Sequence, residues 1–145
     1  MKLRVLSLAA IGAVGFVAPA LAHHSFAMFD ADKTVTLNGT VMEFEWTNPH
    51  SWIRIDVADQ TGKELQWAIE MNAPAQLTQR GWNPNTIKPG DKITMTGRRV
   101  KSGAAYMNLT DRANIVMADD GKEIFRTNNY GTEQRKRPAA GLTNP

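Results

Sequence analysis

The chain has 145 residues, a formal net charge of +3 at neutral pH and no cysteine. Its positive charge lies at the two ends: residues 23–125 hold eleven Lys and Arg against thirteen Asp and Glu, whereas residues 126–145 hold four basic residues and one acidic residue. The near-neutral central part argues against a nucleic-acid-binding groove, which needs concentrated positive charge. Without cysteine, the fold must depend on core packing rather than on disulfides.

Residues 1–22 have the pattern of a secretory signal peptide. A positive start at Lys2 and Arg4 precedes an uncharged, mostly apolar run over residues 5–17, which is too short to span a bilayer. We therefore expect a bacterial protein that is periplasmic or secreted after removal of the signal near Ala22. Once the signal is removed, we do not expect the chain to span a membrane.

The cleavage site decides which residue begins the mature protein. Cleavage after Ala22 leaves His23 at the start, followed by His24. The triplet of residues 18–20, Ala-Pro-Ala, is a second match to the small-x-small pattern, and cleavage there would make His23 the third residue. We favour cleavage after Ala22, because the alternative triplet contains proline.

Residues 34–126 are predicted to form the folded domain, in which strands with period-two hydrophobic patterns are interrupted by one short helix. The predicted strands cover residues 34–46, 52–57, 65–71, 93–97, 106–117 and 124–125. The helix is predicted over residues 73–80, with Asn72 as its N-cap and Gly81 at its exit. We expect the strand over residues 106–117 to be interrupted near residues 111–112.

Several residues predict bends and contacts within these strands. The inward face of residues 34–46 changes parity near Met42 and Glu43, which suggests a β-bulge. Gly39 and Gly97 lie inside predicted strands and favour strong curvature there. In residues 65–71 the positions 65, 67, 69 and 71 are expected to face the core, and Trp82 is expected to pack back against the sheet.

The order of three strands, a short helix and further strands describes a small Greek-key β-barrel of the OB type, an all-β fold with one helix. The predicted domains are the signal peptide over residues 1–22, an arm over 23–33, the OB-like barrel over 34–126 and a disordered basic tail over 127–145. The tail is assigned from its polar, basic and Pro/Gly-rich composition.

The sequence also resembles a family of small secreted bacterial proteins catalogued only as a domain of unknown function. The resemblance lies in a series of short motifs that span nearly the whole mature domain. These are His-His-Ser-Phe at 23–26, Gly-Thr-Val at 39–41, Asn-Pro-His at 48–50, Gly-Trp at 81–82 and Pro-Gly-Asp at 89–91, together with Phe29, Trp46, Trp67, Glu70 and Leu77. The resemblance implies an exported OB-like barrel, and it implies no reaction.

The histidines suggest a copper site. If His23 is the first residue, its α-amine and imidazole together chelate copper(II), and a second imidazole from His50 would complete the arrangement known as a histidine brace. His24 is an alternate ligand, and the thioether of Met28 could serve copper(I). The competing interpretation is a solvated terminus, with the His50 ring bonded to a backbone carbonyl.

Aromatic residues suggest a second kind of site. OB barrels bind ligands on faces that carry exposed aromatics. Trp67 is in phase with core positions, whereas Trp52 is out of phase with Ile53 and is the best candidate for an exposed aromatic. The alternative function is therefore a non-catalytic domain that binds an envelope peptide, a glycan or another envelope protein through Trp52.

The sequence shows no pattern that predicts an enzyme. Glu43 and Glu45 at alternate positions of one strand are typical of a solvated face. Ser25 lies beside His24 without a third partner, and no cysteine is present. We therefore expect a binding module rather than a catalyst.

Overall fold

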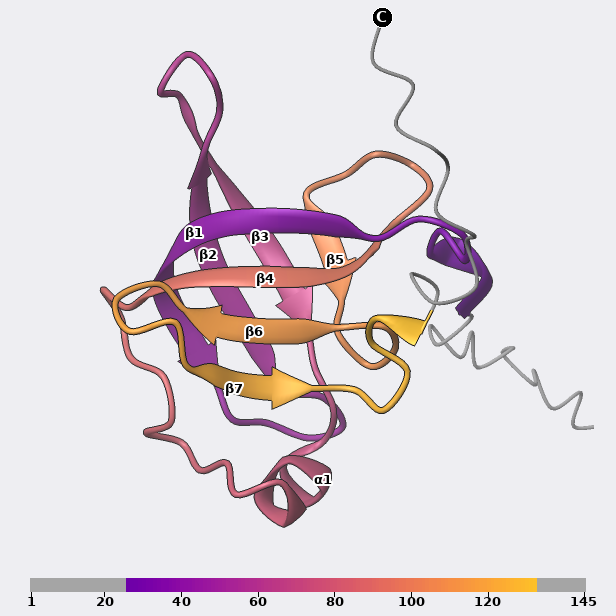
Figure 1. Ribbon diagram of the computed structural model, residues 1–145, viewed down its shortest axis with the longest axis vertical. Coiled ribbons are helices and arrows are strands. Elements are labelled where there is room, and N and C mark those ends of the chain that lie inside the picture. Colours follow the sequence, from indigo (N-terminus) through magenta and orange to yellow (C-terminus); the bar gives the residue numbers. More distant parts are fainter. Residues whose placement is uncertain (1–25, 133–145) are drawn as a thin grey trace, which may run out of the picture.

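The computed structural model describes residues 26–132, and Figure 1 shows their arrangement. A 3-10 turn, a six-residue α-helix and seven strands make up this part of the chain. In chain order they are η1 (Phe26–Met28), β1 (Val35–Glu45), β2 (Trp52–Ala58), β3 (Glu64–Glu70), α1 (Pro74–Gln79), β4 (Lys92–Arg99), β5 (Tyr106–Asn108), β6 (Asn114–Met117) and β7 (Glu123–Arg126).

The strands form a closed barrel with OB topology. The order β1-β2-β3-β5-β4 is closed by pairing of β1 with β4, and α1 lies between β3 and β4 in the chain. The β3–β5 pair is parallel, while the other pairs are antiparallel. β6 pairs with β4 on the edge opposite β1, next to β5 along the same edge, and β7 pairs with β6. The predicted all-β, OB-like fold is therefore confirmed.

β1 pairs with two neighbouring strands and bends between the two pairings. Its residues 35–40 pair with β4 and its residues 40–45 pair with β2. The register shifts between Val41 and Glu43, which confirms the predicted bulge. Gly39 lies next to Thr40, the residue that pairs with both strands. A Cβ atom on Gly39 would be 2.9 Å from the carbonyl oxygen of Asp56. A side chain there would therefore obstruct the close approach of β1 and β2.

β4 changes partners at Gly97 along the edge opposite β1. Residues 93–96 pair with β6, whereas Arg98 and Arg99 pair with β5. A Cβ atom on Gly97 would lie 2.6 Å from Cδ2 of Leu109 and 2.8 Å from the carbonyl oxygen of Asn108. The bend predicted at this glycine is thus also a site of close backbone approach.

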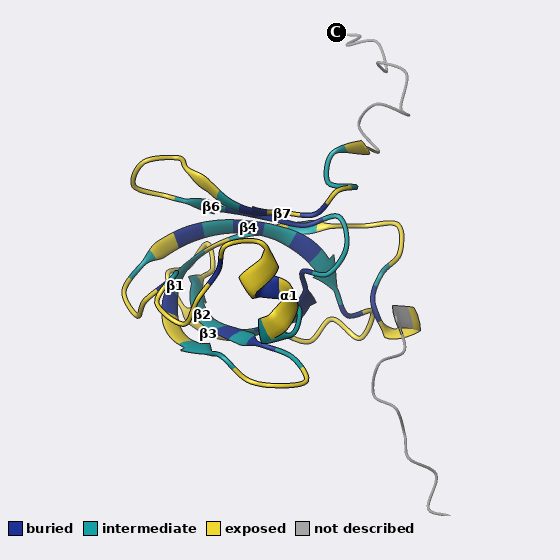
Figure 2. Ribbon diagram, turned by 90° about the horizontal axis from the view of Figure 1, so that it is seen from below, coloured by how far each residue is buried: buried dark blue, intermediate teal, exposed yellow. Residues whose placement is uncertain are grey.

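The core fills the barrel, and α1 covers one end of it (Figure 2). Leu77 of α1 is fully buried, and Trp82 is 3% exposed and donates a hydrogen bond from Nε1 to the carbonyl oxygen of Ile124. Trp82 thus packs against the sheet as predicted. The predicted cap is wrong, because the N-cap is Ala73 and the Asn72 amide instead donates to the Gln76 side chain.

The predicted inward face of residues 65–71 is correct only for its second part. Trp67, Ile69 and Met71 are buried, but Leu65 is 53% exposed. Leu65 pairs with Val57 near the tip of the β2–β3 hairpin, which projects beyond the barrel in Figure 1. The period-two pattern is continuous through Leu65, but the core does not extend to that part of the hairpin.

Packing continues beyond β7. Thr127 is 5% exposed, and its hydroxyl accepts a hydrogen bond of 2.9 Å from the amide of Ala113. The Asn129 side chain accepts from the amide of Arg112 and donates to Asp111. These side chains form hydrogen bonds with residues 111–113, which connect β5 and β6. The folded part thus extends past the boundary predicted at residue 126. Residues 133–145 of the predicted tail lie outside the described residues.

Within residues 26–132, no helix has the length and apolar character needed to cross a membrane.

Candidate functional site

His50 lies in the turn before β2, where the chain holds its ring against the end of β3. The Thr47 hydroxyl donates to the carbonyl oxygen of His50 at 3.0 Å, and the Asn48–Pro49 peptide bond in this turn is cis. The imidazole Nδ1 is 3.0 Å from the carbonyl oxygen of Met71 and 3.3 Å from Oε1 of Glu70. The His50 side chain is 24% exposed.

These two contacts fix which nitrogen of His50 carries a proton. A backbone carbonyl and a carboxylate oxygen both accept hydrogen bonds, so Nδ1 must be the donor to Met71 and Glu70. In the neutral ring the lone pair is then on Nε2. The bond to the Met71 carbonyl is the contact that the competing interpretation of His50 predicted. A carboxylate or carbonyl behind the ring is also the arrangement that orients metal-binding histidines in proteins.

Glu70 is a buried carboxylate between two partners. The residue is 4% exposed and lies at the end of β3, opposite Trp52 on β2 and Asn108 on β5. Its Oε1 faces His50, and its Oε2 accepts a hydrogen bond from the hydroxyl of Tyr106. Burial of such a group is tolerated when its oxygens have hydrogen-bond partners.

Tyr106 is in turn shielded by two aromatic rings. Its ring stacks on Trp52 with centroids 5.7 Å apart, and it forms a T-shaped pair with Phe29 with centroids 5.2 Å apart. Burial raises the pKa of the Tyr106 phenol above its ordinary value, and the hydrogen bond to Glu70 and the charge of Glu70 raise it further. Tyr106 therefore stays a neutral donor to the carboxylate.

Trp52 also lies near a charged pair. The residue is partly exposed, and the Arg54 guanidinium carbon lies 5.8 Å from its ring centroid. Arg54 Nε also contacts Oε1 of Glu45 at 3.1 Å. An aromatic ring beside a cation and a carboxylate is a surface that can hold a ligand by stacking and by hydrogen bonds.

The amino-terminal arm enters the domain beside this cluster. Phe29 is 5% exposed and forms an isolated β-bridge with Val100. Hydrogen bonds of 2.9 Å on either side, from Asp30 to Arg99 and from Lys101 to Met28, hold the backbone of the arm. Three contacts therefore run from the arm to His50: Phe29 to Tyr106, Tyr106 to Glu70, and Glu70 to His50.

The structure brings two of the predicted site residues to the Glu70–Tyr106 pair, because His50 contacts Glu70 and Trp52 stacks on Tyr106. The other two, His23 and His24, lie outside the described residues. Within residues 26–132, no group of three or more His, Asp or Glu side chains is placed to hold a metal ion. The connection of His50 to Tyr106 was not predicted, because it depends on the parallel pairing of β3 with β5, which no local pattern indicates.

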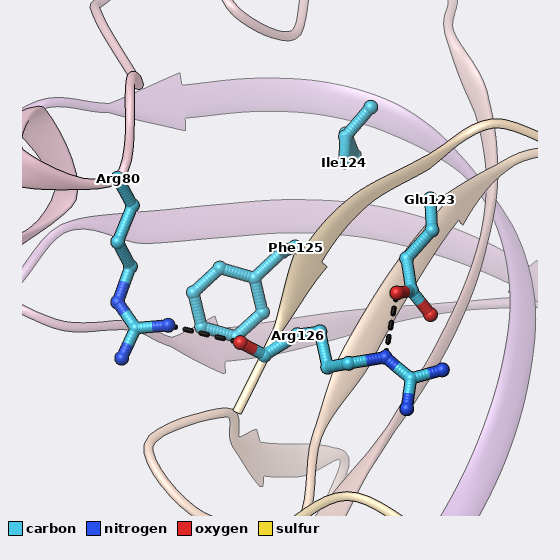
Figure 3. A pocket seen from close by; sticks show the side chains of 5 residues that line it. All are labelled: Arg80, Glu123, Ile124, Phe125 and Arg126. Carbon is cyan, nitrogen blue, oxygen red and sulfur yellow. Dashed lines mark hydrogen bonds and ion pairs between the residues drawn. The ribbon is translucent and has the colours of Figure 1, made fainter. Parts of the chain in front are cut away.

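A pocket of about 220 Å³ lies at the opposite edge of the sheet, over β7 (Figure 3). Arg80 donates from Nη1 to the carbonyl oxygen of Arg126 and lies over the ring of Phe125, while the Arg126 side chain pairs with Glu123 at 2.6 Å. The polar groups that line this pocket thus bond to each other and to the outer edge of β7. We interpret them as covering an edge strand, which would otherwise expose unpaired backbone groups.

Comparisons with known proteins give a family and a similarity of shape. A family model described as a family of unknown function, DUF6152, matches residues 12–108. No curated protein matches the chain. Among solved structures, the chain is similar to Rim1, a mitochondrial single-stranded DNA binding protein of S. cerevisiae, with 11% sequence identity and a TM-score of 0.41 over 59% of this chain and 95% of that chain.

Proposed function

We propose that this chain, which belongs to the DUF6152 family of unknown function, is an exported, non-catalytic copper-binding protein. In this proposal the α-amine and ring of His23 and the Nε2 atom of His50 bind one copper(II) ion. The observation that carries the proposal is the pair of acceptors behind the His50 ring, Met71 at 3.0 Å and Glu70 at 3.3 Å. They orient the ring and place the lone pair that would bind the metal on Nε2.

The position of the arm supports the involvement of His23. Phe29 is fixed beside Tyr106, and five residues lie between it and His23. Three of them, Phe26–Met28, form the 3-10 turn η1, which rises only about 2 Å per residue. The arm that carries His23 therefore begins beside the series of contacts that leads to His50, which supports His23 as part of the site.

The donor set suits copper more than other metals. Copper(II) favours nitrogen ligands in a tetragonal plane, and an N-terminal histidine supplies two nitrogens from one residue. His24 is an alternate imidazole ligand. Cleavage after Ala20 would instead place His23 third in the mature chain, where copper binds to the amine, the amides and one imidazole without any need for His50.

A competitive copper(II) titration tests the proposal. The protein is exported with its own signal peptide, and intact mass confirms that it begins at His23. Two further proteins are compared with it: one with an added methionine before His23, and His50→Ala. We expect tight one-to-one binding that is lost with the added residue and weakened by His50→Ala. Equal and weak binding by all three proteins would contradict the proposal.

The second candidate function is binding of an envelope peptide, glycan or protein on the outer face of β2. The partly exposed Trp52, stacked on Tyr106 beside the Arg54–Glu45 pair, favours it. In that case Trp52→Ala would abolish capture of the partner, while a blocked amino terminus would have no effect. The copper proposal predicts instead that a blocked amino terminus abolishes binding of copper(II), while Trp52→Ala does not.

A further inference from the structure

Tyr106 contacts both Phe29, in the arm that carries His23, and Glu70, the carboxylate behind His50. We infer that Tyr106 is a positioning residue that couples docking of the amino-terminal arm to the orientation of the His50 ring, so that the two parts of the proposed copper site assemble together. That this coupling serves copper binding rests on the proposed function. The coupling itself is a property of the metal-free protein.

The hydroxyl of Tyr106 acts on the His50 side. It donates to Oε2 of Glu70, which directs Oε1 toward Nδ1 of His50 at 3.3 Å. The backbone of Glu70 is also fixed, because its carbonyl oxygen accepts from the amide of Leu109 at 2.9 Å. Removal of the hydroxyl would leave one oxygen of a buried carboxylate without this donor, and the carboxylate would then turn to find another.

The ring and backbone of Tyr106 act on the arm. The ring forms a T-shaped pair with Phe29, with centroids 5.2 Å apart and an interplanar angle of 71°. The carbonyl oxygen of Tyr106 accepts from the amide of Val100 at 3.2 Å, and Val100 is the residue that bridges to Phe29. Displacement of Phe29 would therefore disturb Tyr106 directly, and through it the carboxylate behind His50.

A simpler role for Tyr106 is to fill space between Trp52 and Phe29. Tyr106→Phe separates the two roles, because it keeps the ring contacts and removes the hydrogen bond to Glu70. Tyr130→Phe is the matched control, since it removes the chain's other tyrosine hydroxyl, in a residue whose ring packs with Arg126. A purely space-filling ring predicts the same behaviour for both variants.

The experiment has a metal-free measurement and a copper measurement. In the metal-free protein, nitrogen-15 NMR of the His50 ring should report a protonated Nδ1, and both Tyr106→Phe and Phe29→Leu should shift this signal. Phe29→Leu should cause no additional shift in the Tyr106→Phe background. With copper, Tyr106→Phe should weaken copper(II) affinity about tenfold, the lower end of the effect of changing a metal ligand's hydrogen-bond partner, and change the EPR spectrum, while Tyr130→Phe matches the wild type.

Unchanged ring signals in both Tyr106→Phe and Phe29→Leu would overturn the inference. A wild-type protein without terminus-dependent copper binding would overturn the proposed function instead, and the NMR measurement would still decide whether Tyr106 couples the arm to His50. Glu70→Gln serves as a second variant, because it changes the same hydrogen bond from the other side. If Tyr106 acts through Glu70, the double variant should bind copper no more weakly than Glu70→Gln alone.

Discussion

The hydroxyl of Tyr106 donates a hydrogen bond to the carboxylate of Glu70, a residue 36 positions earlier in the chain. The pairing of β3 with β5 makes this contact possible, because it places Glu70 and Asn108 opposite each other on parallel strands. It gives the buried carboxylate a second partner besides His50. A neutral phenol, a carboxylate and an imidazole thus form one hydrogen-bonded series at the surface of the barrel.

The first prediction concerns the ionisation of Tyr106. Burial, followed by the hydrogen bond to Glu70 and its charge, raises the pKa of this phenol above its ordinary value of 10.0. In Tyr130→Phe, Tyr106 is the remaining tyrosine, so phenolate absorbance in the ultraviolet reports it alone. We expect that absorbance to rise only at a pH well above 10.0. A titration centred on the ordinary pKa would show that the Tyr106 hydroxyl is not buried and hydrogen-bonded to Glu70.

The second prediction concerns stability at alkaline pH. Below the ordinary pKa, the folded and unfolded chains both keep the Tyr106 proton, and the contribution to stability is complete. Above pH 10.0 the unfolded chain releases this proton, whereas the folded chain retains it, so the free energy of unfolding falls as pH rises. Urea unfolding measured across this range should show a smaller decline in Tyr106→Phe than in the wild type. Equal slopes would contradict the raised pKa.

The third prediction concerns the bend in β4. Gly97→Ala would place a methyl group 2.8 Å from the carbonyl oxygen of Asn108 and 2.6 Å from a Leu109 methyl group. Overpacking of this kind costs about 1–3 kcal/mol, and we expect a loss of that size in urea unfolding. The same substitution at Gly39, where the methyl group would approach the Asp56 carbonyl oxygen at 2.9 Å, should also destabilise. Wild-type stability in both variants would contradict the close approach of these strands.

The fourth prediction compares two buried hydroxyls. Ser51 is fully buried and its Oγ has no hydrogen-bond partner among the described residues, whereas the Thr127 hydroxyl accepts from the amide of Ala113. Burying a hydroxyl without a partner costs about 1–3 kcal/mol, so Ser51→Ala should leave stability unchanged or increase it by about 1 kcal/mol.

Thr127→Val is the matched comparison, because valine keeps the shape and removes the hydroxyl from a bonded pair. It should destabilise by about 1–3 kcal/mol, since the buried amide of Ala113 loses its acceptor. Thermal or urea unfolding of both variants provides the comparison. A neutral Thr127→Val would mean that the residues after β7 do not contribute to the folded unit.

The sequence predicts the barrel well because its signals are local. The parity change at Met42 and Glu43, the glycines at 39 and 97 and the position of Trp82 each reflect a constraint within one strand or loop, and the structure shows the expected bulge, bends and packing. The strand order also follows from the order of the elements, since a helix after the third strand is typical of an OB barrel. The exposed Leu65 shows the limit of a local pattern, which does not reveal where the core ends.

The candidate site is less predictable for the same reason. His50 and Trp52 carry signals of their own, a Pro-His turn and a tryptophan out of phase with the core. Glu70 and Tyr106 become important only because β3 and β5 lie side by side, which is a long-range pairing. Phe29 is likewise placed by its bridge to Val100, 71 positions later, and no pattern in the arm predicts that contact.

The most direct test of the central claim asks whether copper bound at the amino terminus lies at His50. Copper(II) is paramagnetic and broadens the NMR signals of nearby nuclei, so one equivalent is added to isotope-labelled protein that begins at His23. We expect loss of the amide signals of His50, Met71 and Tyr106, with the hairpin tips at 59–62 and 119–122 unchanged. Broadening confined to the first few residues, with His50 unaffected, would contradict it.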